Sequence, residues 1–493
     1  MLLLRLAKTG PVARNAFGRS FAAAPTKNTK IGLGLPLPFA RGGIQTRTIT
    51  SQMATPRING KRLMDTLHKT CEIGKAHKYG EHYTETGMAR LTLNDDDRTV
   101  RLWLTEQAEA IGCSVTVDEM GNMFIVRPGR SADPKVAPVY MGSHLDTQLT
   151  GGRYDGILGV MAGLEALRTL HEIEYVTEGP IGLVNWTNEE GARFPMTTMS
   201  SGVWAGTVPL ETAWSMREIT APAAGSSEPA TVKQELERIG FLGKVPASHT
   251  ATPMAAHFEL HIEQGPILED TQRRIGVVQG GQGYQWFEVE VVGRDSHAGT
   301  TPLATRRDAM LAAARMIVAS HTIAVNHDGV ITTGVVKTEP GTVNTIARVA
   351  RLTLDIRHPK AEALASMVQT CQTQFDEIAR DGTATGQGIA VNWRQFAKSP
   401  PVTFHEDCIS AIEDAAAEEL PEKPQGKTLW MPLWSGAGHD SCNTSRHCPT
   451  GMIFTPTRDG LSHTPTEYCS PEDCILGAQV LLGAVLRFDA QRR

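Results

Sequence analysis

The sequence predicts an α/β fold in which a mixed, mainly parallel sheet covered by helices is combined with a ferredoxin-like α+β domain. The chain has 493 residues, more than a single domain usually holds. Between residues 138 and 261, short apolar runs alternate with helical patterns, which is typical of a mainly parallel sheet with helices on both faces. From residue 283 the order changes to β-α-β-β-α-β, the order of ferredoxin-like domains.

The first part of the chain contains the elements predicted for the parallel sheet. A helix is expected at Asn94–Gly112, with three aspartates in its first turn and a glycine at its end. A hairpin around a Gly-Asn turn follows, and then strands and helices alternate. The predicted ranges are Val115–Val117 and Met123–Val126 for the hairpin, then Pro138–Gly142, Gly156–Leu170, Ile181–Trp186 and Ala256–His261. The small, turn-rich residues of Pro222–Pro229 predict a surface loop.

The second part contains the ferredoxin-like elements and a return to the first sheet. Alternating apolar residues predict strands, and longer amphipathic stretches predict helices. The strands are expected at Phe287–Val292, Val330–Val336, Leu352–Ile356 and Gly388–Trp393, and the helices at Arg307–His321 and Ala361–Asp381. The chain then returns with a helix at Glu406–Glu418, a strand at Gly451–Phe454 and a closing helix at Cys474–Phe488.

The N-terminal extension differs in composition from the rest of the chain. The first 64 residues hold eleven Lys or Arg and no Asp or Glu. A long, basic, acid-free N-terminus predicts a mitochondrial transit peptide, and we assign residues 1–57 to this extension. The alternative is a cytosolic form that starts at Met53.

Charge and hydropathy restrict the partners of the protein. Without the first 64 residues, 37 Lys and Arg face 53 Asp and Glu, a formal charge of −16. This acidic balance argues against nucleic acid as a partner. No uninterrupted apolar run approaches the ~18–20 residues of a membrane span, so no membrane partner is expected either. The eight cysteines match no structural zinc spacing, and we expect them to be reduced.

Five clusters of polar residues, far apart in the sequence, contain the side chains that a two-metal site requires. Two divalent ions ~3.5–4 Å apart need a bridging carboxylate, further ligands for each ion and a general base beside the shared water. The clusters are His144 with Asp146, Asp155, Glu189 with Glu190, His261 and His463. One such cluster alone is more often a solvated or core feature, but all five together predict a metal centre.

The residue types suit particular positions in such a centre. His144 offers a neutral imidazole, and Asp146 can accept its other ring N–H and so fix its orientation. Asp155 offers two oxygens among neighbouring glycines, which makes it the natural bridge. Adjacent carboxylates often mark a solvated surface. Because Glu189 and Glu190 follow an apolar strand, two different roles are expected for them.

The motifs of this chain resemble those of a known family. The strings GSHLDT, GGRYDGILGVMAGLEAL, NEEGARF, HIEQGP, GRDSHAGTTP, LDIRH and IFTPTRDGLSHTP closely resemble the amidase/hydantoinase/carbamoylase family, which belongs to the clan of co-catalytic zinc aminopeptidases and aminoacylases. The resemblance extends from about Ile58 to Phe488. It implies a catalytic domain in two parts, residues 58–282 and 399–493, with an inserted lid or dimerisation domain at residues 283–398, called the lid domain below.

The resemblance also implies how the metal centre is divided. The implied ligand sets are His144, Asp155 and His261 for one cation, and Asp155, Glu190 and His463 for the other. Glu189 would be the base that takes a proton from the shared water. Imidazole and carboxylate ligands suit zinc, which we expect first, and also manganese, cobalt or nickel.

Four further residues are implied as substrate contacts. His297 resembles the residue that stabilises the oxyanion, and Gln264 is a further contact beside His261. Asn344 and Arg357 resemble the family's substrate-holding pair, in which Arg357 would bind the carboxylate. The alternative for Arg357 is a surface residue at the end of a strand. The family also implies a homodimer, formed through the lid domain, in which the lid residues reach the partner's metals.

The implied activity is hydrolysis of the ureido group of N-carbamoyl amino acids, such as 3-ureidopropionate, to the amino acid, ammonia and carbon dioxide. An allantoate amidohydrolase is the alternative, since it needs the same machinery and a different pocket. Tyr284 or Trp286 would shape the pocket, so the choice between an α- and a β-amino acid derivative stays open. Aminoacylases and peptidases come next, but peptidases of this clan usually have an acidic residue where this chain has His261. A non-catalytic binding protein would lack a ligand or the base, and none is lost here.

Overall fold

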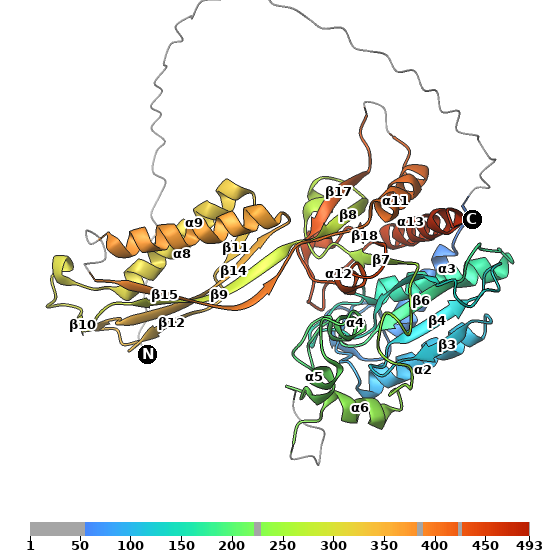
Figure 1. Cartoon of the computed structure of the whole chain (residues 1–493), viewed down its shortest axis with the longest axis horizontal. Coiled ribbons are helices and arrows are strands. Elements are labelled where there is room, and N and C mark those ends of the chain that lie inside the picture. Colours follow the sequence, from blue (N-terminus) through green and yellow to red (C-terminus); the bar gives the residue numbers. More distant parts are fainter. Residues whose placement is uncertain (1–54, 221–227, 382–387, 423–425, 493) are drawn as a thin grey trace, which may run out of the picture. The chain divides into compact units, whose positions relative to one another are not determined.

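The computed structural model describes residues 55–220, 228–381, 388–422 and 426–492, and its strands form two large sheets (Figure 1). The first sheet has nine strands in the order β16-β8-β18-β7-β5-β6-β4-β3, with β17 also paired to β8. Its strands are β3 (Ser114–Val117), β4 (Met123–Arg127), β5 (Val139–His144), β6 (Ile181–Trp186), β7 (Ala256–Ile262), β8 (Ile275–Gly281), β16 (Val402–Thr403), β17 (Trp430–Ser435) and β18 (Thr450–Thr455).

The centre of this sheet is parallel. Strand β5 pairs in parallel with β6 and β7, and β7 pairs in parallel with β18. The antiparallel additions are β4 and β3 on one side and β8 and β16 on the other. The predicted mixed α/β sheet is confirmed. The sequence pattern does not predict β8 and β17, which extend the sheet beyond β18.

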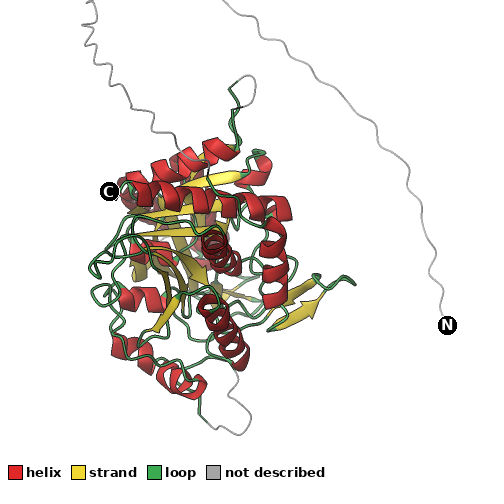
Figure 2. Cartoon of the chain, turned by 90° about the vertical axis from the view of Figure 1, so that its right-hand side faces the viewer, coloured by secondary structure: helices red, strands yellow, loops and turns green. Residues whose placement is uncertain are grey.

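Helices flank this sheet, and their starts follow from local sequence (Figure 2). The helix α2 (Asp95–Glu109) begins where the Asn94 side chain accepts a hydrogen bond from the backbone N–H of Asp97. In the same way Ser470 caps α13 (Pro471–Ala490), which has a proline in its first turn. The other helices are α1 (Gly60–Thr70), α3 (Ile157–Glu172), α4 (Met199–Trp204), α5 (Leu210–Ser215), α6 (Val232–Ile239), α7 (Ile267–Asp270), α11 (Glu406–Glu419), α12 (Asp440–Thr444) and the 3-10 turn η2 (Arg458–Gly460).

The helix α3 is buried along nearly its whole length and packs directly on the parallel strands. A Cβ atom at Gly159 would lie 2.4 Å from the carbonyl oxygen of Leu260 in β7, so only glycine allows this approach. The close packing brings the start of α3, next to Asp155, to the ends of the strands.

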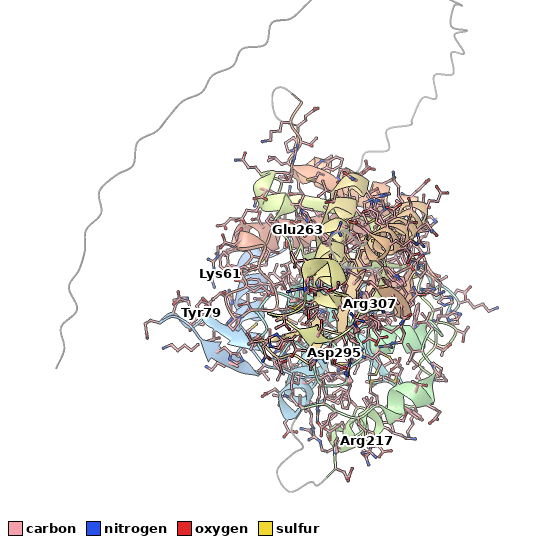
Figure 3. All side chains as sticks on the ribbon, turned by 90° about the vertical axis from the view of Figure 1, so that its left-hand side faces the viewer. Lys61, Tyr79, Arg217, Glu263, Asp295 and Arg307 are labelled. Atoms are coloured by element: carbon pink, nitrogen blue, oxygen red, sulfur yellow. The ribbon has the colours of Figure 1, made fainter. Side chains whose placement is uncertain are left out.

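A small hairpin of β1 (Lys75–Lys78) and β2 (Thr86–Met88) precedes α2. Its tip carries Tyr79, which is exposed (Figure 3). Its other end is held by the loop before Asp155, because the backbone N–H of Met88 donates to the Gly151 carbonyl at 2.8 Å.

The second sheet is formed by residues 283–399 and has its own core. Its order is β11-β14-β9-β15, with β12 also paired to β14 and all pairs antiparallel. The helices α8 and α9 cover one face (Figure 1). The elements of residues 283–399 are β9 (Gly283–Val292), β10 (Ser296–His297), η1 (Leu303–Thr305), α8 (Ala309–His327), β11 (Val330–Thr332), β12 (Val336–Glu339), β13 (Thr345–Ile346), β14 (Val349–His358), α9 (Ala361–Arg380) and β15 (Ala390–Ser399). Of these strands, β10 and β13 pair with each other in a separate two-stranded sheet. The chain order β9, α8, β11, β14, α9, β15 is the predicted ferredoxin-like order.

The structure corrects one predicted strand of the lid domain. The predicted strand Val330–Val336 is two strands, β11 and β12, both paired to β14. Between them the backbone N–H of Val335 donates to the Thr353 hydroxyl at 3.0 Å, which interrupts the ladder. Sequence alternation cannot reveal this interruption, because it depends on a side chain of the neighbouring strand.

By length and composition, α8 is the one helix in the described part of the chain that could cross a membrane. Its inner face, which includes Ala312 and Met316, is buried in the core of the lid domain. A helix packed on a sheet can meet the same length and composition test. The extension at residues 1–57, apart from its last three residues, and most of the loop at Pro222–Pro229 lie outside the described residues, so these remain predictions.

Candidate metal centre

The structure brings together all five predicted ligands in two groups that share one carboxylate. In each group the ligand atoms lie within 4.8 Å of one another. The groups are His144, Asp155 and His261, and Asp155, Glu190 and His463. Their roles as ligands remain predictions, but their positions match the two sets that the sequence motifs imply.

Neighbouring parallel strands place most of these side chains. His144 ends β5, the adjacent glutamates follow the end of β6, and His261 lies near the end of β7. Because these three strands are parallel neighbours, their carboxyl ends meet at one edge of the sheet. Asp155 lies in the turn before α3, and His463 lies in the loop between η2 and α13.

The two oxygens of Asp155 face different partners. Oδ1 lies 3.5 Å from Nε2 of His144 and 3.0 Å from Nε2 of His261. Oδ2 lies 3.4 Å from Nε2 of His463, and that nitrogen is 3.3 Å from a carboxylate oxygen of Glu190. A carboxylate with one oxygen toward each group has the arrangement that a bridging ligand needs.

Backbone carbonyls determine the tautomers of the two buried histidines. Nδ1 of His144 is 2.9 Å from the carbonyl oxygen of Asp146, and Nδ1 of His261 is 2.8 Å from that of Ile262. A carbonyl only accepts, so each Nδ1 carries the proton and each Nε2 presents a lone pair. Nε2 of His144 is buried without a hydrogen-bond partner in the described part of the chain. Lone pairs that converge in this way fit a bound cation.

The electrostatics of the cluster favour a positive charge there. Although burial opposes a charge on His144, the carboxylates of Glu189 and Asp155 hold the pKa of its imidazole well above the ordinary value. The hydrogen bond with Asp155 raises the pKa of His463 to about 9. When no cation is bound, protons on these histidines balance the negative charge of the carboxylates, and a bound cation would replace those protons.

Asp146 does not have the contact that the sequence suggested. The prediction that its carboxylate accepts the His144 ring N–H is wrong, because its own backbone carbonyl does so and the carboxylate lies 3.9 Å away. The carboxylate instead accepts the backbone N–H groups of Glu189 at 3.3 Å and Glu190 at 3.2 Å. Asp146 therefore supports the histidine ring through its backbone carbonyl and the two glutamates through its carboxylate.

The two glutamates have different surroundings. Glu190 is held by Gln148, whose side-chain amide donates to Oε2 at 2.8 Å and whose backbone N–H donates to Oε1 at 3.2 Å. Burial, and next the charge of Asp155, raise the pKa of Glu190 to about 7. The Glu189 carboxylate accepts no hydrogen bond from the described residues and lies 3.5 Å from Nε2 of His144. Burial raises the pKa of Glu189 well above its ordinary value, so this side chain is suited to accept a proton.

Two residues near His261 have separate functions. Gln264, predicted as a substrate contact, donates from Nε2 to Oδ2 of Asp155 at 2.8 Å and so lies against the carboxylate that the two groups share. Glu263, labelled in Figure 3, accepts the backbone N–H groups of Ile267 and Leu268 at 2.8 Å each. Glu263 therefore stabilises the start of α7 and is structural.

A buried carboxylate beneath the centre was not predicted. Glu259 is fully buried and accepts the hydroxyls of Ser143 at 2.7 Å and Ser441 at 2.6 Å. It forms a third group of possible ligand atoms with His261 and His439. Burial lowers the pKa of His439 to about 3, so this ring stays neutral beside His261. The signal available in the sequence was the spacing of Glu259 and His261, two residues apart on one strand.

No hydrogen bond or ion pair among the described residues joins the predicted lid residues to the five predicted ligands. His297 accepts the backbone N–H groups of Gly299 and Thr300 on its Nδ1, at 3.0 and 3.2 Å. The carbonyl of Asn344 accepts the N–H of Ala298, so Asn344 and His297 lie close together on the lid.

Arg357, near the end of β14, binds one residue of its own strand and one residue just after β17. Its Nε and Nη2 contact the carboxylate of Asp355 at 2.8–3.1 Å, and its Nη1 donates to the Gly436 carbonyl at 2.6 Å. Its guanidinium lies 5.6 Å from the centre of the Tyr284 ring, which is 5.1 Å from the Trp286 ring. The arginine thus lies beside one aromatic ring, that of Tyr284, and a competing carboxylate.

Comparisons with known proteins relate this chain to one family. Residues 140–487 match the model of peptidase family M20/M25/M40. The chain is 39% identical over 440 residues to an N-carbamoyl-L-amino-acid amidohydrolase of Rhizobium meliloti, covering 88% of this chain and 98% of that protein. It is 30% identical over 401 residues to an allantoate amidohydrolase of Bacillus subtilis, covering 80% and 91%. A crystal structure of a hydantoinase/carbamoylase family amidase from Burkholderia multivorans is similar with a TM-score of 0.78 and 40% identity, covering 87% of this chain and 98% of that chain.

Proposed function

Because the chain belongs to peptidase family M20/M25/M40, we propose that it is a two-metal amidohydrolase that cleaves the ureido group of N-carbamoyl amino acids. The observation that carries this proposal is the carboxylate of Asp155 between two ligand groups. Beside them lies the buried carboxylate of Glu189, which accepts no hydrogen bond from the described residues. The relatives of this chain that are named N-carbamoyl-L-amino-acid amidohydrolase support N-carbamoyl amino acids as the substrate class.

The residues of this chain would divide the chemistry as follows. Two bound cations would lower the pKa of a shared water and polarise the ureido carbonyl. Glu189 takes a proton from the attacking water and returns it to the departing amino-acid nitrogen. The bond between that nitrogen and the carbonyl carbon breaks, and the released carbamate yields ammonia and carbon dioxide. His297 donates to the developing oxyanion.

Arg357 would bind the substrate carboxylate. Its Nε and Nη2 hold the carboxylate of Asp355 as a two-donor fork, and a substrate carboxylate would take the place of Asp355 in that fork. Lysine cannot reproduce that fork, so Arg357→Lys should raise KM for carboxylate substrates by about tenfold or more, with kcat less affected. Unchanged kinetics on every ureido acid tested would remove Arg357 from the substrate site.

An allantoate amidohydrolase is the second candidate, since one relative carries that name. The two candidates are separated by assaying the purified enzyme with added zinc or manganese on 3-ureidopropionate, N-carbamoyl-α-amino acids, allantoate and dipeptides. Release of ammonia from the ureido acids alone supports the first proposal. Preference for allantoate supports the second, and cleavage of dipeptides alone would contradict both.

We further propose that each active site is built from two chains of a homodimer. Two observations support this. Among the described residues the hydrogen bonds of His297 and Asn344 stay within the lid domain, and α8 exposes apolar side chains. These include Val318, 69% exposed, and Val325, 67% exposed. Such a face suits a second copy of the lid domain, as in a closed two-fold dimer.

Subunit mixing tests the shared site. His297→Ala has an intact cluster and a defective lid, and Glu189→Ala has the reverse, so each homodimer should be nearly inactive. After unfolding and remixing equal amounts, about half the dimers are mixed, and one of the two sites in each is intact. Activity should recover to about a quarter of wild type by this symmetry argument. Verified mixed dimers without any recovery would refute the shared site.

A further inference from the structure

Glu467 is a buried carboxylate that the proposed reaction does not use. Only 1% of its surface is exposed, although it lies four residues after His463 in a loop. Its Oε1 accepts the backbone N–H groups of Tyr154 and Asp155, at 3.1 Å each. Its Oε2 accepts the Ser462 hydroxyl at 2.8 Å. Glu467 therefore connects the loop of the bridging aspartate to the loop of His463.

The backbone around Asp155 is shaped to receive this carboxylate. A Cβ atom at Gly152 would lie 2.2 Å from Oε1 of Glu467 and 2.3 Å from its Cβ, so the side chain occupies the space that glycine leaves. A Cβ at Gly87 would lie 2.6 Å from Cα of Pro465, in the same loop as Glu467. The hairpin and both ligand loops are thus in direct contact.

The Ser462 hydroxyl has one proton and two acceptors within reach. Its oxygen is 2.8 Å from Oε2 of Glu467 and 3.1 Å from Oδ2 of Asp155. A hydroxyl donates one hydrogen bond, so the proton points to one carboxylate at a time. The shorter contact directs it to Glu467.

The direction of this proton matters to one cation position more than to the other. Oδ2 is the oxygen of Asp155 that faces His463, whereas Oδ1 faces the two buried histidines. A carboxylate oxygen has two lone pairs, so a proton donated to Oδ2 would occupy one of the two that a cation at the His463 side could use. The amide of Gln264 already donates to Oδ2 at 2.8 Å, so a second donated proton would leave that oxygen no free lone pair.

We propose that Glu467 is a positioning residue that holds the Ser462 proton and so keeps Oδ2 of Asp155 open for the cation bound by Glu190 and His463. This inference rests on the proposed two-cation site. It predicts that the two cation affinities respond separately to changes at Glu467, because only one oxygen of the bridge is affected.

Three variants test this positioning role by calorimetric titration of the metal-free protein with zinc at pH 8. In Glu467→Gln the amide oxygen still accepts the backbone N–H groups, and the amide N–H₂ faces Ser462, which must then donate to Asp155. One cation should bind as in wild type, and the other about 10- to 100-fold more weakly, the range of a charge-assisted hydrogen bond. Ser462→Ala should leave both affinities near wild type. The double variant should restore the weakened one, because no proton remains to point at Oδ2.

The outcomes separate this inference from the proposed function. Glu472→Gln, an exposed glutamate in the first turn of α13, is the matched control and should bind like wild type. If the wild-type protein binds two zinc ions and Glu467→Gln binds both with unchanged affinity, the positioning role of Glu467 is overturned and the two-cation site is not. Equal weakening of both sites, or no recovery in the double variant, would also overturn the positioning role and indicate a purely structural carboxylate. A wild-type protein that binds no zinc would overturn the two-cation site itself.

Discussion

At Gly156, replacement by alanine should have two effects that can be measured separately: backbone strain and loss of the cation site. Its φ is 66° and its ψ is −47°, a conformation that side-chain-bearing residues rarely adopt. A Cβ atom there would lie 2.3 Å from Cε1 of the His144 ring. Ordinary carbon contacts are about 3.5 Å, so the ring must move by about 1 Å or the turn must open.

Gly156→Ala should therefore cost about 1–3 kcal/mol of stability through backbone strain. It should also weaken zinc binding, because His144 can no longer keep Nε2 directed at Asp155. Gly112→Ala is the matched control: Gly112 also has a positive φ, 74°, but a Cβ there meets nothing within 4 Å. Urea unfolding of the metal-free proteins measures the strain, and zinc titration measures the site.

Both variants should lose stability, and only Gly156→Ala should lose zinc affinity. If Gly156→Ala keeps full zinc affinity, the assignment of His144 as a ligand whose ring position depends on the space at Gly156 is refuted. Equal zinc loss in both variants would show that the effect comes from general destabilisation.

The two adjacent glutamates should respond differently to the same change: Glu189→Gln should keep both cations and lose about 10²- to 10⁴-fold in kcat, whereas Glu190→Gln should lose a cation. Metal analysis beside kinetics decides this, and the reverse pattern would contradict the division of roles. Without cations, stability should fall as pH rises. The folded-state pKa of Glu190, about 7, lies above its ordinary 4.5, so its contribution is present below pH 4.5 and lost as pH rises through 7. The pKa of His463, about 9 against 6.5, extends the loss from pH 6.5 through 9. Urea unfolding in chelator across this range checks the trend, which added zinc should oppose. A fluorescent reporter fused to residues 1–52 should enter mitochondria, and a uniformly cytosolic signal would favour Met53 as the start.

The sequence by itself determined the family, the fold class and which side chains converge. It could do so because His144, the adjacent glutamates and His261 follow apolar runs that predict buried parallel strands, and such strands end at one edge of a sheet. Their types and long motifs then indicate cation binding, whatever the details of packing.

Only the tertiary structure decided which atom contacts which. The motif places Asp146 beside His144, yet a backbone carbonyl binds the ring and the carboxylate turns to the glutamates. Glu467 reaches Asp155 across 312 positions of the chain, and Arg357 is already paired with Asp355. Spacing along the sequence cannot specify such contacts, because a hydrogen bond depends on distances of a few tenths of an ångström and on the direction of the donor. Those distances are set when distant loops pack together.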